Sequence, residues 1–494
     1  MKLKKIIVEN TTTKIDQDVC SELDCYSFAR SRFGDKNVFL LESLSGPARD
    51  RKASIIGVDV IFGIDIYSDN AKLHGDVAIV NYIITFLEQD GFVVNPKDFS
   101  IKYLNNDKDR VWNLLRSIKN AFQLPKNDEY TLSYFGYFAY ETIRFIENIP
   151  EIINENYDYP IIALNVYQTF IIYHVDGRVE TVVNNCSLWN KKTSTDYQFL
   201  LSPQNNSSAN IASNYPTKKE VLNKITKNQY CENVKTALKH INIGDIYQIQ
   251  LGHEIHVKTE VDPLTVYKTL RDRNPSPYMF IANVGGVDLI GASPELFVSL
   301  QNDIIEMRPI AGTAGKKSGK SNQEIIDSMT NSVKERAEHV MLVDLCRNDI
   351  SRICKTDSLE VDELMVVEEY SHLFHMVSNV KAVISQEYDV FDIIKATFPA
   401  GTMTGTPKVK AMELIEKFET SKRGIYAGAI GLIGFNNTMN TALCIRSTFR
   451  QNGVYHLRAS AGAVSDSIPE NEWMETLYKI SSVYYAVTKE ELIK

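Results

Sequence analysis

Two glutamates in the second half of the chain have the surroundings expected of metal ligands. Glu338 lies in a helical pattern in which Leu342 and Leu345 fall on the same face, at i+4 and i+7. A carboxylate on such an apolar ridge must be paired, protonated or bound to a cation. Glu475 lies in a second helical pattern, and two carboxylates from two helices can hold one Mg²⁺ whose remaining ligands are waters. The alternative is structural: nearby arginines can neutralise Glu338, and Lys479 at i+4 can pair with Glu475.

Two segments that combine small residues with hydroxyls are suited to binding an anion. They are Arg308–Thr313 and Pro399–Lys408, and the second runs directly into a helical pattern over Val409–Phe418. The N-terminus of a helix favours carboxylates and phosphates. Arg446, at the end of a strand pattern, can clamp a carboxylate with two hydrogen bonds. Each feature alone can be an ordinary turn or a capped helix, but together they predict an anionic small molecule with more than one carboxylate.

Three other patterns resemble cofactor sites but lack a required residue. Gly315–Ser321 resembles a phosphate-binding loop, yet Ala314 occupies the position of its first glycine. Gly428–Gly434 has the wrong glycine spacing for a dinucleotide fingerprint and falls within a strand pattern. His372 and His375 could share a metal ion, but no third ligand is near them in sequence. A nucleotide-hydrolysing, dinucleotide-binding or zinc enzyme is therefore not predicted.

The elements that position these residues lie on both sides of a polar segment, residues 202–216, which is predicted to be a linker. Residues 1–201 contain short β-branched and aromatic runs typical of strands. In residues 217–494, helical patterns and strand-like runs follow one another without strict alternation, which favours an α+β fold over a doubly wound parallel sheet. The predicted helices are Thr217–Ile243, Asn322–Asp349 and Pro469–Leu492, and the predicted strands are Ile246–Val257, Tyr278–Val284, Val287–Ile290, Leu296–Leu300, Gly428–Phe435 and Thr441–Phe449.

Composition narrows the class of protein further. The 494 residues include 62 acidic and 54 basic side chains, a formal charge of -8, which argues against a nucleic-acid-binding protein. No run reaches the roughly 18 apolar residues of a membrane span, and the N-terminus lacks the apolar stretch of a secretory signal. The seven cysteines form no Cys-x-x-Cys pair, which indicates reduced thiols and predicts a cytoplasmic protein.

A set of collinear motifs resembles those of the chorismate-utilising enzymes, most closely the anthranilate synthase component I branch. The resemblance implies one α+β unit, a β-sandwich of two antiparallel sheets flanked by helices, with chorismate and Mg²⁺ in a cleft. It also implies that residues 1–201 form a regulatory region and residues 217–494 the chorismate-binding catalytic region. The motifs are Gly291–Glu295, Arg308–Thr313, Glu338–Asp349, Gly401–Lys408 and Asp466–Thr476, with Phe39–Ser43 and Gly136–Glu141 in the first part.

The same resemblance implies a role for individual residues. Glu338 and Glu475 would hold Mg²⁺, which grips the ring carboxylate of chorismate. Glu295 would protonate the departing C4 hydroxyl, helped by a hydrogen bond from Thr402, and His375 would act as the base in pyruvate elimination. The residues implied to bind chorismate are Gly312, Thr313, Tyr426, Arg446 and Gly462, and those implied to bind tryptophan as a feedback inhibitor are Ser43, Pro277, Tyr278 and Met279.

Two positions indicate the branch of the family. Isochorismate and salicylate synthases carry a lysine that activates water, where this chain has Gln248. Many aminodeoxychorismate synthases carry a nucleophilic lysine where this chain has Ala311. The sequence therefore favours anthranilate as the product, made in the first committed step of tryptophan biosynthesis. The alternatives are an aminodeoxychorismate synthase component I of the folate pathway, a synthase that stops at the aminated intermediate, and a catalytically silent tryptophan-binding regulator.

The source of ammonia is predicted to lie outside the chain. A glutaminase needs an activated cysteine, commonly in a Gly-x-Cys-x-Gly turn in the amidotransferases that pair with this family, and no cysteine here has that setting. The chain is therefore expected to use a separate glutamine amidotransferase subunit, or free ammonia at high concentration.

Some positions depart from the family pattern. Leu251–Glu254 reads Leu-Gly-His-Glu in place of a Leu-Ser-Gln-Arg-like run, which leaves the contacts made there open. Ser460 replaces a glycine of a Gly-Ala-Gly turn, and Tyr478 replaces a common asparagine. Residues 47–54 differ from the aromatic-bearing sequence that usually follows the Leu-Leu-Glu-Ser motif, close to the predicted tryptophan site.

Overall fold

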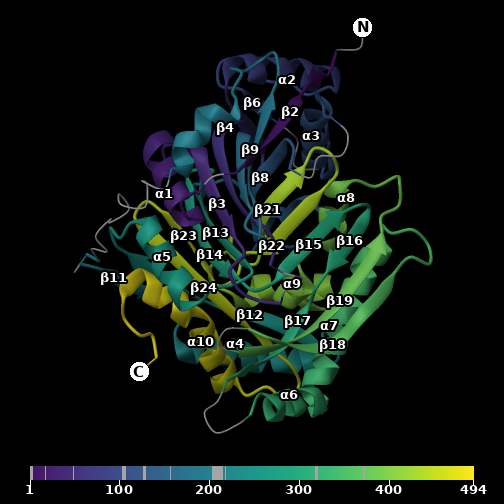
Figure 1. Ribbon diagram of the computed structural model, residues 1–494. Coiled ribbons are helices and arrows are strands. Elements are labelled where there is room, and N and C mark those ends of the chain that lie inside the picture. The colour runs from purple at the N-terminus through teal and green to yellow at the C-terminus, as the bar shows by residue number, and fades with distance from the viewer. Residues whose placement is uncertain are drawn as a thin grey trace.

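Helices surround a large system of antiparallel strands, so the predicted α+β class is confirmed (Figure 1). The structure is a computed structural model. It describes residues 4–16, 18–47, 49, 51–102, 107–125, 130–155, 157–202, 215–216, 218–316, 321–370 and 373–493. Most of the predicted linker, residues 203–214, lies outside these ranges. No helix in the described ranges has the length and apolarity needed to cross a membrane.

The strand network divides at two long paired strands, β4 (Ser54–Ile66) and β9 (Ile162–Tyr173). One branch starts on β4 and carries part of the candidate site at its far end. Its order is β3 (Val38–Glu42), β13 (Tyr278–Val284), β14 (Val287–Ser293), β23 (Ser447–Gln451), β24 (Val454–Ala463) and β12 (Gln248–Lys258), with the short β11 (Glu220–Asn223) and β20 (Gly405–Thr406) paired to β12.

The second branch starts on β9. Its order is β8 (Ser133–Phe138), β21 (Ala429–Gly434), β22 (Met439–Leu443), β15 (Leu296–Gln301), β16 (Ile304–Met307) and β19 (Leu373–Val383), with β17 (Ile310–Gly315) and β18 (Glu360–Glu369) also paired to β19. The strands outside the two branches are β5 (Asn70–Gly75), β6 (Ser100–Lys102), β10 (Val179–Asn185) and β2 (Glu9–Ile15), and a separate parallel pair, β1 (Ile6–Ile7) with β7 (Phe122–Gln123).

The two branches pack against each other through an aromatic core. Phe39 of β3 stacks on Phe135 of β8 with ring centroids 3.7 Å apart, and Tyr167 of β9 meets Phe39 edge-on at 4.8 Å. Phe280 of β13 and Ile430 of β21 belong to the same buried cluster. Because β3 pairs with β13 and β8 pairs with β21, each branch contains strands from before and from after the polar segment. The division of labour between the two parts of the chain stays a prediction.

Helices pack against strands of both branches. Pro469–Thr488 forms α10 close to the predicted bounds, and Lys408–Phe418 forms α9, which packs on β12. The other α-helices are α1 (Glu22–Phe33), α2 (Val77–Gln89), α3 (Asp109–Asn120), α4 (Lys227–Asn242), α5 (Pro263–Arg273), α6 (Asn322–Asn331), α7 (Val333–Ser351) and α8 (Val390–Thr397). Helices α2 and α3 lie at the end of the strands near the N-terminus of the chain and α4, α6 and α10 at the opposite end, while α7 and α9 pack against strands nearer the middle (Figure 1).

Three predicted elements differ from the structure for local reasons. The helix predicted from Thr217 is wrong in its first part, because 220–223 form β11 and Thr226 caps the helix that begins at Lys227. The helix predicted over 322–349 is two helices, since Ser332 ends α6 and its side chain caps α7 by accepting the Glu335 amide. The strand predicted over 441–449 is broken at Arg446, whose φ of 51° is left-handed.

Candidate active site

Four glutamates from two helices form one acidic cluster. Glu335 and Glu338 lie three residues apart on α7, and Glu472 and Glu475 have the same spacing on α10. Burial, with the charges of Glu335 and Glu475, raises the pKa of Glu338 to about 7. The pKa values of Glu335 and Glu472 are also raised, first by burial and then by Glu475. The structure thus brings the two predicted metal ligands together, and it adds Glu335 and Glu472, which the sequence analysis missed although their Glu-x-x-Glu spacing is a visible signal.

Few cations balance these carboxylates. Lys479 Nζ lies 2.6 Å from Glu475 Oε1, so the structural alternative for Glu475 is also present, and the Glu475 side chain is 49% exposed. Lys334 and Lys479 both act to lower the pKa of Glu338, but burial and like charge outweigh them. Gln248 Nε2 donates to Glu338 Oε1 at 2.9 Å. A partly desolvated set of oxygen donors with excess negative charge fits a hard divalent cation such as Mg²⁺.

Glu295 is a buried carboxylic acid at the turn between β14 and β15. Its residue is 6% exposed, and burial raises its pKa to about 8. Thr402 Oγ1 donates to Glu295 Oε1 at 2.9 Å, and the backbone amide of Ile310 also lowers the pKa, but neither offsets desolvation. The carboxyl is therefore mostly protonated at pH 7, as an acid that gives up a proton requires.

Thr402 reaches Glu295 because the preceding residue is glycine. A Cβ on Gly401 would lie 2.0 Å from Leu345 Cδ2 of α7, so a larger residue would push the Thr402 turn away from the helix. The absence of a side chain at Gly401 thus lets α7 and the turn pack in contact, which holds Thr402 within hydrogen-bonding distance of the acid.

His375 is a buried imidazole on β19. Burial, with the charge of Arg446, lowers its pKa to about 4, so the ring is neutral at pH 7. Its Nδ1 lies 3.4 Å from the carbonyl oxygen of Gly312. When Nδ1 carries the proton toward that carbonyl, the lone pair lies on Nε2, as a base requires. His372, the other histidine of the excluded zinc pair, lies outside the described residues.

Gly312 joins this histidine to the acidic cluster. It lies in a bulge where β17 pairs with β19, its φ is 79°, and a Cβ there would lie 2.6 Å from Glu335 Oε2. The backbone conformation therefore favours glycine, and its missing side chain leaves room for the Glu335 carboxylate. The side chain of Thr313 lies outside the described part of the structure, although its backbone pairs with His375.

The remaining predicted substrate residues surround the same region. Arg446 is partly buried, and burial lowers its pKa while Tyr426 and Glu475 act to raise it. In the described ranges no carboxylate forms an ion pair with its guanidinium, so this cation is available for an anionic ligand. On β24, a Cβ at Gly462 would lie 2.8 Å from the side-chain amide nitrogens of both Gln248 and Gln250, so the absence of a side chain leaves room for these amides in their present positions.

The comparison with known proteins shows the family to which the chain belongs. Residues 83–485 match the model described as chorismate binding enzyme. The chain belongs to this family. The sequence is 37% identical over 486 residues to the 2-amino-4-deoxychorismate synthase of Streptomyces globisporus. This alignment covers 98% of this chain and 97% of that protein. It is 32% identical over 467 residues to anthranilate synthase component 1 of Acetivibrio thermocellus, covering 91% of this chain and 90% of the relative.

A solved structure supports the fold of this chorismate binding enzyme. Anthranilate synthase component I from Streptococcus pneumoniae superposes with a TM-score of 0.71 at 27% sequence identity, over 88% of this chain and 92% of that chain. The resemblance to the chorismate-utilising enzymes is thereby confirmed at the level of the family and the fold. The relatives that match carry the names of two different products, 2-amino-4-deoxychorismate and anthranilate.

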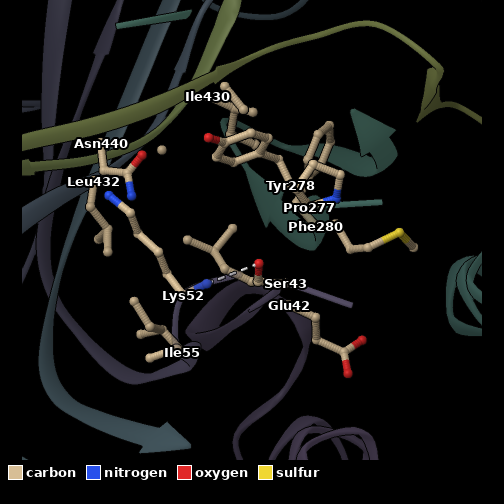
Figure 2. Close-up of a pocket in the computed structure, with 15 residues that line it drawn as sticks. Glu42, Ser43, Lys52, Ile55, Pro277, Tyr278, Phe280, Ile430, Leu432 and Asn440 are labelled. Carbon is tan, nitrogen blue, oxygen red and sulfur yellow. Dashed lines mark hydrogen bonds between the residues drawn. The ribbon is translucent and has the colours of Figure 1, made fainter. Parts of the chain in front are cut away.

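A pocket lined by none of the four glutamates of the acidic cluster lies between β3, β13 and β21. All four residues predicted to bind tryptophan line it: Ser43, Pro277, Tyr278 and Met279 (Figure 2). Ser43 Oγ accepts a hydrogen bond from the backbone amide of Lys52 at 3.2 Å. Lys52 and Ala53 of the divergent segment also line the pocket. The departure from the family pattern noted in the sequence therefore falls on the pocket wall.

Proposed function

We propose that this protein is the large subunit of an anthranilate synthase, which converts chorismate and ammonia to anthranilate and pyruvate. The observation that carries the proposal is a pair of buried groups with opposite pKa changes. Glu295, with a pKa of about 8, is a protonated acid, and His375, with a pKa of about 4, is a neutral base. Groups whose environments push their pKa values apart are suited to separate acid and base roles in one reaction.

Chorismate is a dicarboxylate, and the site offers two kinds of partner for it. Glu338 and Glu475, with Glu335 and Glu472 beside them, would hold Mg²⁺, which when bound draws electron density from the ring through its carboxylate. Arg446 would bind a carboxylate through its guanidinium. The other groups proposed to contact chorismate are Tyr426 and the backbones of Gly312, Thr313 and Gly462.

The protein side chains would then move two protons. Ammonia adds at C2 of the ring while the C4 hydroxyl leaves as water, taking its proton from Glu295, which Thr402 orients. His375 next removes the proton from C2, the bond between C3 and the enolpyruvyl oxygen breaks, and the side chain leaves as pyruvate after gaining a proton. The product ring is aromatic. Because Glu295 and His375 are buried, neither proton is exchanged freely with water during the reaction.

A glutamine amidotransferase subunit would supply the ammonia. Relatives of this chain carry names that designate component 1 of a synthase, which implies a second component. None of the seven cysteines, all of them free thiols, lies in the turn that such a glutaminase uses. Free ammonia at high concentration would substitute for the partner in an assay.

A second candidate product is 2-amino-4-deoxychorismate, the aminated intermediate before pyruvate leaves. The observation that favours it is the 37% identity over nearly the whole chain to a protein named for that product. Both candidates use the acid step, and they differ in whether the base step follows. Aminodeoxychorismate synthase of the folate pathway is less favoured because Ala311 cannot act as a covalent nucleophile, and a silent regulator is less favoured because Glu295, Glu338, His375 and Glu475 are all present.

Tryptophan is the proposed regulator, acting in the pocket that Ser43, Pro277, Tyr278 and Met279 line. The part of the chain before the polar segment would then contribute Ser43 to this regulatory pocket, and the part after it would contribute Pro277, Tyr278 and Met279 as well as the catalytic groups. This assignment would place the enzyme at the entry to tryptophan biosynthesis.

One product assay tests these alternatives. Purified protein is incubated with chorismate, Mg²⁺ and an ammonium salt, and the products are separated by chromatography. Fluorescent anthranilate with an equal amount of pyruvate is expected. Accumulation of 2-amino-4-deoxychorismate without pyruvate would support the second candidate, and no consumption of chorismate would support the regulator. Added tryptophan should slow the reaction, and Tyr278→Ala should remove that inhibition while the uninhibited rate stays unchanged.

A further inference from the structure

Two histidines and one glutamate meet on neighbouring strands at a distance from the acidic cluster. Glu254 and His256 are two residues apart on β12 and therefore share a face, and His456 of β24 is the direct cross-strand partner of His256. His256 is eight residues along β12 from Gln248, about 26 Å at about 3.3 Å per residue. The cluster is thus separate from the candidate active site, and it includes Glu254 of the run Leu251–Glu254, where the sequence departs from its family.

We propose that Glu254, His256 and His456 form a binding site for a transition-metal ion of the Zn²⁺ class. One ligand atom from each residue lies within 4.8 Å of the other two. Glu254 Oε1 is 3.2 Å from His256 Nε2 and 3.4 Å from His456 Nδ1. Ligands about 2.0–2.1 Å from a tetrahedral metal lie about 3.3–3.5 Å apart, so these spacings suit an ion bound between them.

The environment of the cluster favours a cation over a purely hydrogen-bonded triad. Within the described residues, His256 Nε2 and Glu254 Oε2 are buried and make no hydrogen bond. The contact from His456 to Glu254 is long for a hydrogen bond at 3.4 Å. Glu254 is 2% exposed, while the two histidine side chains are 15% and 12% exposed. The histidine side of the cluster is thus the side nearer to solvent, and a metal ion bound there would need a fourth ligand such as a water.

Neighbouring side chains hold the donors in place. The ring of His456 stacks on Phe449, with centroids 4.4 Å apart and planes 10° from parallel. Arg458 Nη1 lies 3.6 Å from Glu254 Oε2, so the guanidinium faces one carboxylate oxygen and the two imidazoles face the other. Arg458 is itself held by Glu419, at 2.6 Å. This arrangement leaves Glu254 ionised with Oε1 directed at the imidazoles, as a ligand must be.

The chemistry of the donors selects the metal. Imidazole nitrogen suits Zn²⁺, Co²⁺, Ni²⁺ and Cu²⁺, whereas Mg²⁺ prefers oxygen ligands. The acidic cluster on α7 and α10 has only carboxylates. The two sites are therefore expected to take different ions, and an ion held between β12 and β24 would brace the two strands that also carry Gln248 and Gly462.

The test uses the full-length protein, stripped of metal and then held in excess Mg²⁺ to occupy the acidic cluster. Titration with Co²⁺ should give the visible absorption of a tetrahedral ion with nitrogen and oxygen ligands and without the near-ultraviolet band of thiolate ligation, and Zn²⁺ should displace it. His256→Gln and His456→Gln should each weaken binding at least about tenfold. The matched control is His240→Gln, which changes a half-buried histidine on another part of the chain, where it pairs with Asp245.

The outcomes are distinct. Wild-type affinity in both cluster variants, a thiolate band, or no Co²⁺ spectrum in the wild-type protein would overturn the proposal. Unchanged circular dichroism of the metal-free variants shows that they fold, and a rise in the unfolding temperature on adding Zn²⁺ to the wild-type protein but not to His256→Gln gives a second readout. Neither result depends on which product the enzyme makes from chorismate.

Discussion

Glu295 and Glu254 are both almost completely buried, at 6% and 2% exposure, but their carboxyl groups have opposite pKa changes. Burial raises the pKa of Glu295 to about 8. Burial acts in the same direction on Glu254, yet the two nearby imidazoles and the charge of Arg458 outweigh it and hold the pKa well below the usual value. The neighbours that act most on Glu295 are instead a hydroxyl and a backbone amide, which are dipoles without net charge, and the charge of Lys479 has a smaller effect than either.

The difference shows that burial alone does not decide what a carboxyl group can do. A carboxyl among dipoles keeps its proton and can donate it, whereas a carboxyl among positive charges stays ionised and can bind a cation. The first arrangement suits the acid step proposed for chorismate, and the second suits the proposed metal site. Changing one glutamate at a time tests whether the two environments have these separate consequences.

The largest effect is expected from Glu295→Gln. Glutamine retains the shape of the side chain and can still accept from Thr402, but it has no acidic proton, so the rate of chorismate amination should fall by about a hundredfold to ten-thousandfold. Steady-state kinetics with ammonium salt measures kcat, and binding of chorismate should be nearly unchanged. A kcat within threefold of the wild-type value would show that another group protonates the leaving hydroxyl.

Stability should respond to the two glutamates in opposite ways. Glu254→Gln breaks a buried ion pair and should lower the free energy of unfolding by about 3–5 kcal/mol at neutral pH. The loss should shrink as the pH falls below about 4.5. In that range the unfolded chain gains a proton on Glu254 while the folded wild-type protein still lacks it, so the wild-type protein loses its advantage until the pH reaches its low folded-state pKa. Urea unfolding at several pH values measures both effects.

For Glu295 the change of stability with pH has the opposite sign. The folded protein holds a proton that the unfolded chain releases between pH about 4.5 and about 8, so the wild-type protein loses stability as pH rises through that range. Glu295→Gln lacks this loss and should gain relative to wild type between pH 5 and pH 8, by at most about 1.4 kcal/mol per pH unit. Parallel pH curves for Glu295→Gln and the wild-type protein would contradict the assigned protonation state.

A smaller effect on catalysis is expected from the acidic cluster. Glu338→Gln removes one oxygen ligand and a negative charge, so the Mg²⁺ concentration for half-maximal activity should rise at least about tenfold. Glu470→Gln is the matched control, because Glu470 is an exposed glutamate on the same helix as Glu475. An unchanged Mg²⁺ requirement in Glu338→Gln would show that the metal binds elsewhere.

The smallest effect concerns the pH dependence of amination. With the rate expressed per unit of NH₃, activity should fall above pH about 8 as Glu295 loses its proton. Thr402→Val removes a hydrogen bond that lowers the pKa of Glu295, so this fall should move to higher pH. His375 contributes no fall on the acid side until pH about 4. If activity in Thr402→Val falls at the same pH as in the wild-type protein, Thr402 does not influence the pKa of the acid.

Much of the local structure could be predicted from the sequence. The α10 helix begins at Pro469 as predicted, since proline suits the first turn and the apolar spacing continues for several turns. The errors lie where capping overrides periodicity, as at Ser332, or where a strand forms through a distant partner, as β11 does on β12. Such pairings depend on residues far away in the chain, so local patterns do not reveal them.

Part of the candidate site could likewise be predicted from the sequence. The resemblance named Glu295, His375, Glu338 and Glu475, but it overlooked Glu335 and Glu472, whose spacing on the two helices was available. The Glu254, His256 and His456 cluster was not predictable, because it depends on the register that places His456 opposite His256.

The sequence by itself determined which chemical groups the protein carries, which helix faces they share and the family to which they belong, because those properties follow from residue type and spacing. Only the tertiary structure decided which of these groups carry a proton and which lie near an opposite charge. Protonation depends on desolvation and on charges a few ångströms away, and those neighbours come from segments that are remote in the chain.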